Sequence, residues 1–402
     1  MAAIFHIKSN KVNMNFTTKE VISTSIISAL GALMFLLLPV IIGITTDNLK
    51  LSEQQSSLLV SFYFIGFLAA CIFSPFITKK LTWKKNSYLG VLFMTLGLVF
   101  IAFVPSYKLV LLFLSFIGLG SGTLFSLAIV ILSNAENAER YFGIKIVFEQ
   151  VLAALLLFVI PVFIVVSFGY QGTFLAISFT VLLLGFASLG LPNASLIINK
   201  NVMKITNKTS PSFNIKLLIA LLCLCFFFGA LSTLWAFVER LAVNNKLSGD
   251  EIGLALSLSV MGGAVGGLLA AYIGNKLNLK KSILLITPLM LLIVWAFYLQ
   301  FAFIVFTLAA FSLSLCWNFS LAYQMKIVIN QDESKASWLA SFIAIGGIIF
   351  PALGGVLLGL SGWLGLFIAI TFTIVICSIG FYNVCAQKQV LIASDIIPNG
   401  LK

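Results

Sequence analysis

Two short stretches, "KKLTWKK" at residues 79–85 and "NKLNLKK" at residues 275–281, nearly repeat each other. Each stretch is a basic gap between two long apolar runs. Lys79 and Asn275 lie 196 residues apart, close to half of the 402-residue chain. A repeat at this distance indicates that one structural unit is used twice. We call these stretches the first and the second clasp.

The composition predicts a membrane protein. Hydrophobic residues make up 61% of the chain and charged residues only 9%, whereas a soluble domain carries about 25% charged residues. Because a soluble fold could not bury this much apolar surface, we expect the lipid bilayer to solvate most of it. The net charge of +12 is concentrated in short gaps between apolar runs, which favours contact with anionic lipid rather than with nucleic acid.

Twelve apolar runs are long enough to cross a bilayer, which requires about 20 residues each. The run from 282 to 325 is divided only by Gln300, and a single helix of that length would be about twice as long as the bilayer core is thick. We therefore predict two helices there. The twelve predicted spans are 20–44, 57–78, 87–105, 108–132, 143–167, 170–192, 216–238, 251–274, 282–299, 301–325, 336–358 and 361–385.

The distribution of basic residues predicts the orientation. With the N-terminus inside, 20 of the 24 Lys and Arg residues fall on the cytoplasmic side. By the positive-inside rule, both termini are expected in the cytoplasm and the protein in the plasma (inner) membrane. The residues expected on the outer side are Lys50, Lys108, Arg240 and Lys246.

The predicted fold class is an all-α integral membrane protein of two pseudo-symmetric six-helix bundles, in which each clasp follows the second span of its bundle.

The first apolar run lacks a cleavage site, so we interpret it as a retained span rather than a signal peptide. Such internal repeats are typical of secondary transporters. The predicted parts are a cytoplasmic tail at 1–19, bundles at 20–192 and 216–385, a polar cytoplasmic linker at 193–215, and a tail at 386–402.

Over nearly its whole length the chain resembles the major facilitator superfamily. After the second span that family has a loop of Gly, three residues, Asp, Arg or Lys, any residue, Gly and two basic residues, with a weaker copy after the eighth span. The resemblance implies that the clasps take part in conformational change; the alternative is that they only anchor the protein at the cytoplasmic surface. The matching basic residues are Lys80, Lys84, Lys85, Lys276, Lys280 and Lys281.

Both clasps depart from the family pattern at two places. Lys79 and Asn275 stand where the family has Asp, which helps to hold one conformation closed. Thr82 and Asn278 stand where it has Gly.

Lys145 and Glu149 are the first candidate site, at the start of the fifth span. Residues four apart share a helix face, but Lys before Glu is the weaker order for an ion pair. Ionisable groups inside a membrane are functional candidates by default. We therefore predict a cavity-facing pair in which Glu149 gains and loses a proton; the alternative is a structural ion pair.

Trp235, Glu239 and Arg240 form the second candidate site, at the outer end of the seventh span. Trp235 and Glu239 share a face, whereas Glu239 and Arg240 are adjacent and are not expected to face each other. Charges near an interface are less costly than central ones. These residues could therefore act as a gate, contact the substrate, or be a pair whose long side chains reach to the water.

Neutral polar residues inside the spans form a third set. Such groups usually bond to neighbouring helices, and lining a substrate cavity is the alternative. These residues are Tyr63, Gln150, Asn318 and Gln324.

Glycine-rich strings at 118–122, 261–267 and 350–355 are not predicted to bind nucleotides. No strand precedes them, and none continues into the Lys-Ser/Thr of a phosphate loop. In apolar helices, small residues let backbones approach closely, so we predict closely packed helices at these positions.

The function favoured by these patterns is secondary active transport of a small organic solute by alternating access, coupled to a proton, by a monomer without cofactor or metal. Uptake is favoured because the Gly-Pro signature of drug antiporters is absent before Pro161. Efflux of amphipathic compounds and a sensor without flux are the alternatives. An enzyme is not expected, since the single histidine is His6 in the N-terminal tail and the six cysteines lack metal-ligand spacing.

Overall fold

The computed structural model describes residues 16–104, 106–135, 138–192, 215–273, 277–299, 302–331 and 338–396. In these ranges, ten helices are long and apolar enough to cross a membrane. The helical elements are α1 (Thr18–Leu49), α2 (Glu53–Lys80), α3 (Trp83–Phe103), α4 (Tyr107–Ser133), α5 (Ala138–Val159), a π-helical stretch (Ile160–Val165), α6 (Val166–Gly185), a 3-10 turn (Phe186–Gly190), α8 (Ile215–Asn244), α9 (Gly249–Ile273), α10 (Leu279–Tyr298), α11 (Phe303–Gln331) and α12 (Trp338–Ile396).

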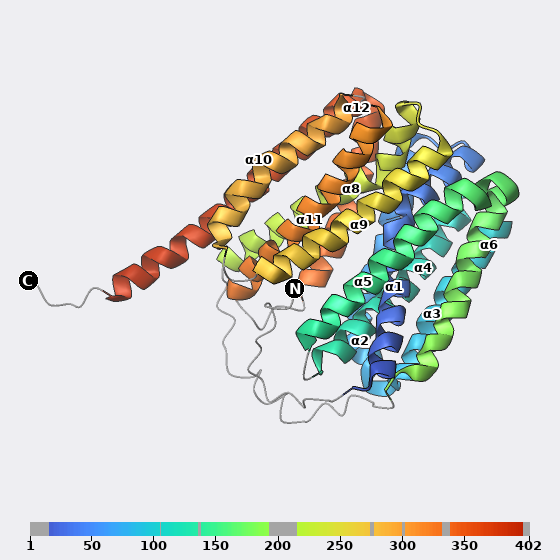
Figure 1. Cartoon of the computed structure of the whole chain (residues 1–402), viewed down its shortest axis with the longest axis horizontal. Coiled ribbons are helices and arrows are strands. Elements are labelled where there is room, and N and C mark those ends of the chain that lie inside the picture. Colours follow the sequence, from blue (N-terminus) through green and yellow to red (C-terminus); the bar gives the residue numbers. More distant parts are fainter. Residues whose placement is uncertain are drawn as a thin grey trace, which may run out of the picture.

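Two of the ten helices contain a reversal of the chain. Arg140–Gly190 and Trp338–Cys385 are 51 and 48 residues long, so they would be about 77 Å and about 72 Å long if straight, more than twice the thickness of the bilayer core. Gly169 (φ +59°) and Gly362 (φ +64°) interrupt them with a backbone conformation that favours glycine. Figure 1 shows α5 and α6 running in opposite directions on either side of this region. The predicted count of twelve is reached when both helices are divided at these glycines.

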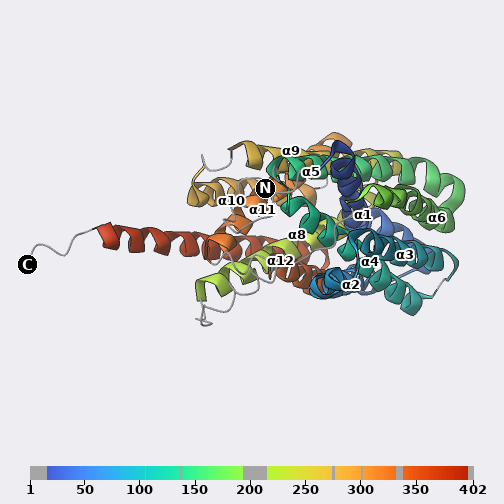
Figure 2. The ribbon, with the colours of Figure 1, turned by 90° about the horizontal axis from the view of Figure 1, so that it is seen from below.

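The helices form two bundles with matching interfaces. In the first half α4 packs against α1, α2 and α3, and in the second half α11 packs against α9 and α10. Between the halves, α1 packs against α8, α2 against α12 and α5 against α9. The second helix of each half thus packs against the fifth helix of the other, counting the first part of α12 as the fifth, as expected for a twofold-related pair. Figure 2 shows the two halves side by side.

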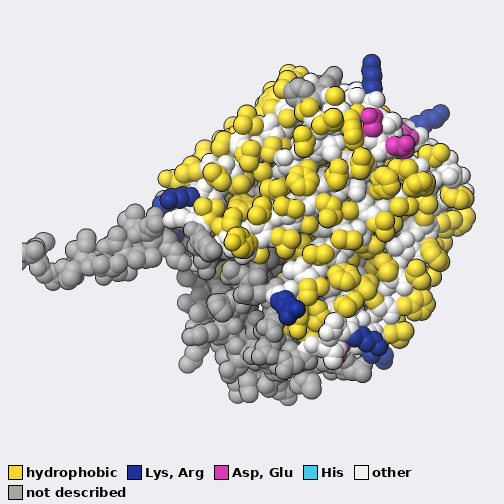
Figure 3. Space-filling view, in the orientation of Figure 1, with side chains coloured by type: hydrophobic (Ala, Val, Ile, Leu, Met, Phe, Trp, Pro, Cys, Tyr) yellow, Lys and Arg dark blue, Asp and Glu magenta, His cyan; other side chains and the backbone are white. Residues whose placement is uncertain are grey.

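Apolar side chains cover the flank of the molecule. Figure 3 shows hydrophobic side chains over most of the visible face, with charged side chains at its margins. Large exposed apolar residues come from both halves, for example Phe179 (65% exposed) and Leu292 (72%). A surface of this kind is stable only in contact with lipid.

Within the described residues, each clasp contains the N-cap of the helix that follows it. Thr82 is the N-cap of α3, and its hydroxyl accepts a hydrogen bond from the Lys85 backbone N–H at 3.4 Å. Asn278 is the N-cap of α10 and accepts from the Lys280 N–H at 2.9 Å. A polar cap therefore starts the third helix of each half, at the positions where the family pattern has Gly.

The ends of the predicted parts differ in part from the structure. α1 begins at Thr18 because Thr17 and Glu20 form a capping box. α12 continues to Ile396, into the predicted tail at 386–402, and its last turns project from the bundle (Figure 1). The tail up to residue 15, the linker at 193–214 and Lys276 lie outside the described residues. The predicted break at Gln300 is confirmed, because α10 ends at Tyr298 and α11 begins at Phe303.

Glycines bring equivalent helices into backbone contact in both halves. A Cβ atom on Gly66 of α2 would overlap the carbonyl oxygen of Ser115 in α4. A Cβ atom on Gly262 of α9 would overlap the carbonyl oxygen of Phe311 in α11. Each pair is separated from its counterpart by 196 residues, the same distance as the two clasps. The close packing predicted for the glycine-rich strings is confirmed, since Gly118 likewise abuts the Tyr63 carbonyl.

Replacing Gly118 by Val is expected to lower the free energy of unfolding by more than about 3 kcal/mol, because its side chain meets a backbone carbonyl that cannot rotate away. Thermal unfolding and size-exclusion behaviour in detergent would measure the loss. Gly267→Ala is the matched control, since nothing lies within 4 Å of a Cβ atom at Gly267, and a helical Gly→Ala change gains about 0.5–1 kcal/mol. Equal stability of the two variants would contradict the close α2–α4 contact.

Candidate functional site

A buried ion pair lies near the start of α5. Lys145 Nζ is 2.6 Å from Glu149 Oε1, and the two residues are 4% and 6% exposed. Ser28 of α1 donates a hydrogen bond to the same carboxylate oxygen at 2.6 Å. This oxygen is therefore shared by a cation from its own helix and a hydroxyl group from a neighbouring helix.

The Lys145 ammonium group also lies over an aromatic ring, 4.4 Å from the centroid of Phe125 in α4. Such cation–π contacts are strongest when they are desolvated. Loss of either charge would leave the other uncompensated, at a cost of about 3–5 kcal/mol in a buried pair. The prediction that Lys145 and Glu149 share a helix face is confirmed. Their role in binding substrate or proton stays a prediction.

Two amide side chains from opposite halves lie against Gly263, at the boundary between the halves. A Cβ atom on Gly263 of α9 would lie 2.8 Å from Asn318 Nδ2 and 3.6 Å from Gln150 Oε1. Gln150 (8% exposed) comes from α5 and Asn318 from α11. Asn318 also donates to the Ser314 carbonyl at 3.0 Å. Because Gly263 has no side chain, two predicted site residues from opposite halves can both lie against it.

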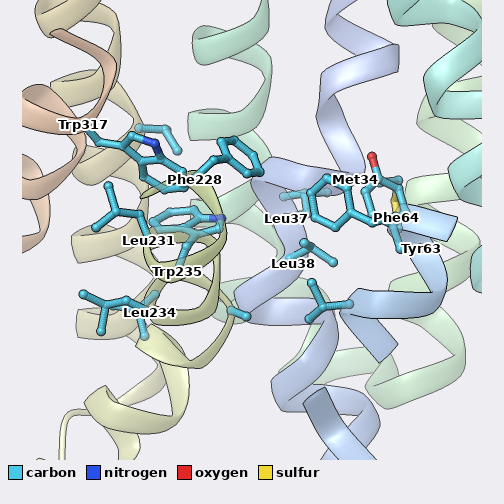
Figure 4. Packing of buried hydrophobic residues seen from close by; sticks show 14 of the residues in the cluster. Met34, Leu37, Leu38, Tyr63, Phe64, Phe228, Leu231, Leu234, Trp235 and Trp317 are labelled. Carbon is cyan, nitrogen blue, oxygen red and sulfur yellow. The ribbon is translucent and has the colours of Figure 1, made fainter. Parts of the chain in front are cut away.

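Four aromatic rings from both halves pack together nearby, and we call Phe35, Phe64, Phe228 and Trp317 the aromatic clamp. Phe35 of α1 stacks on Phe228 of α8, with ring centroids 5.7 Å apart and planes at 28°. Trp317 of α11 meets Phe35 edge-on at 6.2 Å and Phe228 at 5.6 Å. Phe64 of α2 contacts Phe35 at 5.7 Å and Phe228 at 6.1 Å. Figure 4 shows Trp317 close to Phe228, with Phe64 on the side of α2.

Trp235 connects the two halves by a hydrogen bond beside the aromatic clamp. Its indole N–H donates to the Phe35 carbonyl oxygen at 3.2 Å. Pro39 lies inside α1, four residues after Phe35. Since proline has no N–H, the Phe35 carbonyl lacks its usual intrahelical donor, and Trp235 of the other half supplies one. Trp235 is 4% exposed.

A similar hydrogen bond joins α2 to α12. Ser61 donates to the Ile348 carbonyl oxygen at 2.7 Å, and Ile348 lies three residues before Pro351, which lies inside α12. In both cases a side chain of one half bonds to a carbonyl in the helical turn that precedes a proline in the other half.

The second candidate site lies at the far end of the bundle, which we define as the end opposite the clasps. Arg240 Nη1 is 2.7 Å from Asp47 Oδ1 of α1, and Arg240 Nη2 also donates to the Gly43 carbonyl. The prediction that Glu239 and Arg240 do not face each other was wrong, because Arg240 Nε lies 3.3 Å from Glu239 Oε2. Both side chains turn toward α1, where Gly43 lacks the Cβ atom that would collide with the Glu239 carboxylate.

Contacts between the halves gather toward this far end. Besides the α1–α8 cluster, a Cβ atom on Gly253 at the start of α9 would lie 3.3 Å from the Leu157 carbonyl near the end of α5. Gly355 of α12 lies against Ser57 in the first turns of α2. All three contacts involve the far ends of the helices that carry them.

Two predicted polar residues lie within a single half. Tyr63 is fully buried, and its hydroxyl group bonds to Ser121 of α4 at 2.9 Å, which fits the interpretation as a helix-to-helix contact. Gln324 donates to Ser320 at 2.8 Å, while its Oε1 atom is buried without a hydrogen-bond partner.

Four lysines of the clasps lie in the first turns of the third helices. Lys84 and Lys85 belong to α3, and Lys280 and Lys281 to α10. Lys280 Nζ lies 5.6 Å from the ring centroid of Tyr382. Lys80 is the last residue of α2. Their role in conformational change stays a prediction.

Several partners at these sites were missed from the sequence. Ser28, Phe125 and Asp47 lie far along the chain from the residues that they contact, and no spacing rule connects them. A signal did exist for Phe35, since Pro39 predicts an unpaired carbonyl four residues earlier. Among the described residues no group of three or more His, Cys, Asp or Glu side chains is arranged to hold a metal ion.

Comparison with known proteins gives a family match in the second half. A family model described as "Major Facilitator Superfamily" matches residues 217–387. An uncharacterized protein, Cj0987c, of Campylobacter jejuni is 30% identical over 120 residues, which are 29% of this chain. The match spans about a third (34%) of that relative's length.

Solved structures match over nearly the whole chain. A mutant of the nucleoside transporter NupG has a TM-score of 0.74 at 13% identity, covering 90% of this chain and 99% of that one. The D-xylose-proton symporter gives 0.69 at 15%, covering 90% and 97%. A bacterial homologue of the human lysosomal transporter Spinster, in an inward-facing and unoccupied conformation, gives 0.66 at 14%, covering 92% and 98%. At these identities the likeness shows the fold.

The fold and the apolar flank define the class: this is a multi-pass helical integral membrane protein. The second half of the chain matches the family model of the major facilitator superfamily, and over nine tenths of its length the chain shares its fold with solved transporters. These relatives are transporters rather than enzymes.

Proposed function

We propose that the protein is a secondary active transporter that moves a small organic solute by alternating access, coupled to a proton, with uptake favoured over efflux. The observation that carries the proposal is the buried Lys145–Glu149 pair, held by Ser28 inside the membrane and next to the boundary between the halves. Placing such a charged pair in lipid costs free energy, and ionisable groups inside a membrane are functional candidates by default.

The charges of the pair suggest how proton and solute are coupled. As long as Glu149 is ionised, Lys145 is neutralised by it at 2.6 Å. A proton on Glu149 removes that counter-charge, and a buried ammonium group without a partner is strongly unfavourable. An anionic group of the substrate at Lys145 would restore neutrality. Proton and anion then bind together and leave together, which is symport.

Alternating access is supported by the distribution of contacts between the halves. The far ends of the helices are joined by Arg240, Asp47 and Gly43. With the clasps on the cytoplasmic side, as the basic residues predict, the far end is the outer face, and the structure corresponds to a state closed to the outside. Both termini are then cytoplasmic, in a monomer of the inner membrane.

The solved neighbours favour solute transport over a sensor without flux. The D-xylose-proton symporter combines a small organic solute with a proton, and NupG is a nucleoside transporter. Efflux of amphipathic compounds is the second candidate, supported by the many aromatic residues, of which 38 are Phe.

Purified protein in liposomes tests the proposal. With an imposed pH gradient, acid outside, we expect at least one member of a panel of labelled organic acids and neutral metabolites to accumulate in the lumen. An uncoupler should abolish the accumulation. Ligand binding, measured as thermal stabilisation, without any flux would indicate a sensor. Accumulation only with the gradient reversed would indicate efflux.

A further inference from the structure

The aromatic clamp contains a polar atom for which the described protein offers no partner. Trp317 is 6% exposed, and its indole Nε1 is buried without a hydrogen-bond partner. Buried indole N–H groups usually find a hydrogen-bond acceptor, and a buried donor without an acceptor costs free energy. By contrast, the other indole at this boundary, that of Trp235, bonds to the Phe35 carbonyl. The unpaired donor at Trp317 indicates an acceptor that the chain itself does not supply.

The clamp lies between the parts that must move. Phe35 and Phe64 belong to the first half, and Phe228 and Trp317 to the second. Three ring contacts cross the boundary, Phe35–Phe228, Phe35–Trp317 and Phe64–Phe228. When the halves separate, these rings lose each other as partners. A flat ring inserted between them would replace the lost contacts with stacked and edge-on ones of the same kind.

Aromatic rings also connect the clamp with the ion pair. Phe64 contacts Phe67 at 6.1 Å, and Phe67 contacts Phe125 at 5.9 Å. Phe125 lies under the Lys145 ammonium group at 4.4 Å. A row of ring contacts thus leads from the aromatic clamp to the Lys145 ammonium group.

We propose that the substrate is a planar aromatic or heteroaromatic acid: its ring is held by the aromatic clamp, an acceptor atom on or beside the ring accepts a hydrogen bond from Trp317 Nε1, and its anionic group is neutralised by Lys145. This inference rests on the proposed function for the anionic group. The preference for a planar ring rests on the clamp and on Trp317 alone.

Binding and uptake with matched probes test the inference. The planar probes are 4-hydroxybenzoate, nicotinate and orotate, and the non-planar probes are shikimate and lactate. In purified protein we expect at least one planar acid to raise the unfolding temperature, and shikimate and lactate to raise it little. In liposomes with a pH gradient, the same planar acid should accumulate.

Two substitutions separate the role of the N–H group from that of the ring. Trp317→Phe keeps a ring and removes the unpaired donor, so the unliganded protein should unfold at the same temperature or higher. Its KM for the planar acid should rise about tenfold, as expected for one lost hydrogen bond, with kcat nearly unchanged. Phe228→Leu should raise KM further, while Phe226→Leu, at a 42% exposed position on the same helix, is the matched control.

The outcomes are distinguishable. Accumulation of shikimate or lactate but of no planar acid would overturn the aromatic preference and leave proton-coupled transport standing. Binding of none of the planar acids would overturn it as well. Stabilisation by a planar acid without any uptake would support the clamp and contradict the proposed function. A planar acid whose KM is unchanged in Trp317→Phe would remove the indole from the site.

Discussion

Replacing Glu149 by Gln is expected to abolish gradient-driven accumulation of substrate while leaving exchange of substrate across the membrane intact. Gln keeps the size of the side chain but cannot take up and release a proton. Lys145 then has no counter-charge in its buried position and should hold the substrate anion in every cycle. Uptake against a gradient needs net proton movement, whereas exchange does not. Proteoliposomes loaded with unlabelled substrate, compared with empty ones, measure the two activities separately.

The same substitution should also lower stability, so a control is needed. An unpaired buried ammonium group costs about 3–5 kcal/mol, and Glu149→Gln alone is expected to unfold at a lower temperature. The double variant Lys145→Met, Glu149→Gln removes both charges and should recover most of that stability while losing accumulation and exchange. Full gradient-driven accumulation by Glu149→Gln would exclude Glu149 from proton coupling.

Replacing Arg240 by Gln is expected to open the far end of the bundle. Arg240 joins α8 to α1 through Asp47 and the Gly43 carbonyl, and it also neutralises Glu239, whose side chain is only 14% exposed. Loss of a partner from such a buried pair costs about 3 kcal/mol or more, which corresponds to about a hundredfold change in the population of the closed state. Spin labels at Asn48 and Asn244, in a variant without the native cysteines, should then report longer distances.

Asp47→Asn provides the matched control for Arg240. The Asp47 side chain is 69% exposed, and exposed ion pairs contribute only about 0–1 kcal/mol. Its distance distribution should therefore stay close to that of the parent protein. If Arg240→Gln also left the distribution unchanged, the cluster would have no role in closing the far end.

The fold was largely predictable, because lipid imposes a simple rule on sequence. Every span must be a long apolar helix with its backbone groups paired internally, so the apolar runs revealed the helices, and the 196-residue offset of the clasps revealed the two halves. Positions that terminate helices were less clear. The divisions predicted between 167 and 170 and between 358 and 361 lie at or next to Gly169 and Gly362, where the chain reverses, but α12 continues to Ile396, past the predicted end at 385.

Within the site, the sequence identified residues that are costly in lipid and could not identify their partners. Lys145 and Glu149 stood out because four-residue spacing fixes their proximity on one helix. Ser28 is one of many serines and became significant only through its bond to Glu149. Phe35 gained its role from two distant contacts, the Trp235 indole and the Phe228 ring.

The sequence by itself determined the apolar helices, the duplication and the unusual charges, since each depends on short-range spacing or on transfer from water to lipid. Only the tertiary structure decided that Glu239 and Arg240 turn together toward α1, that four rings from two halves meet, and that Trp317 lacks an acceptor. These features depend on side-chain direction and on the packing of helices that are distant in the chain, which local periodicity does not encode.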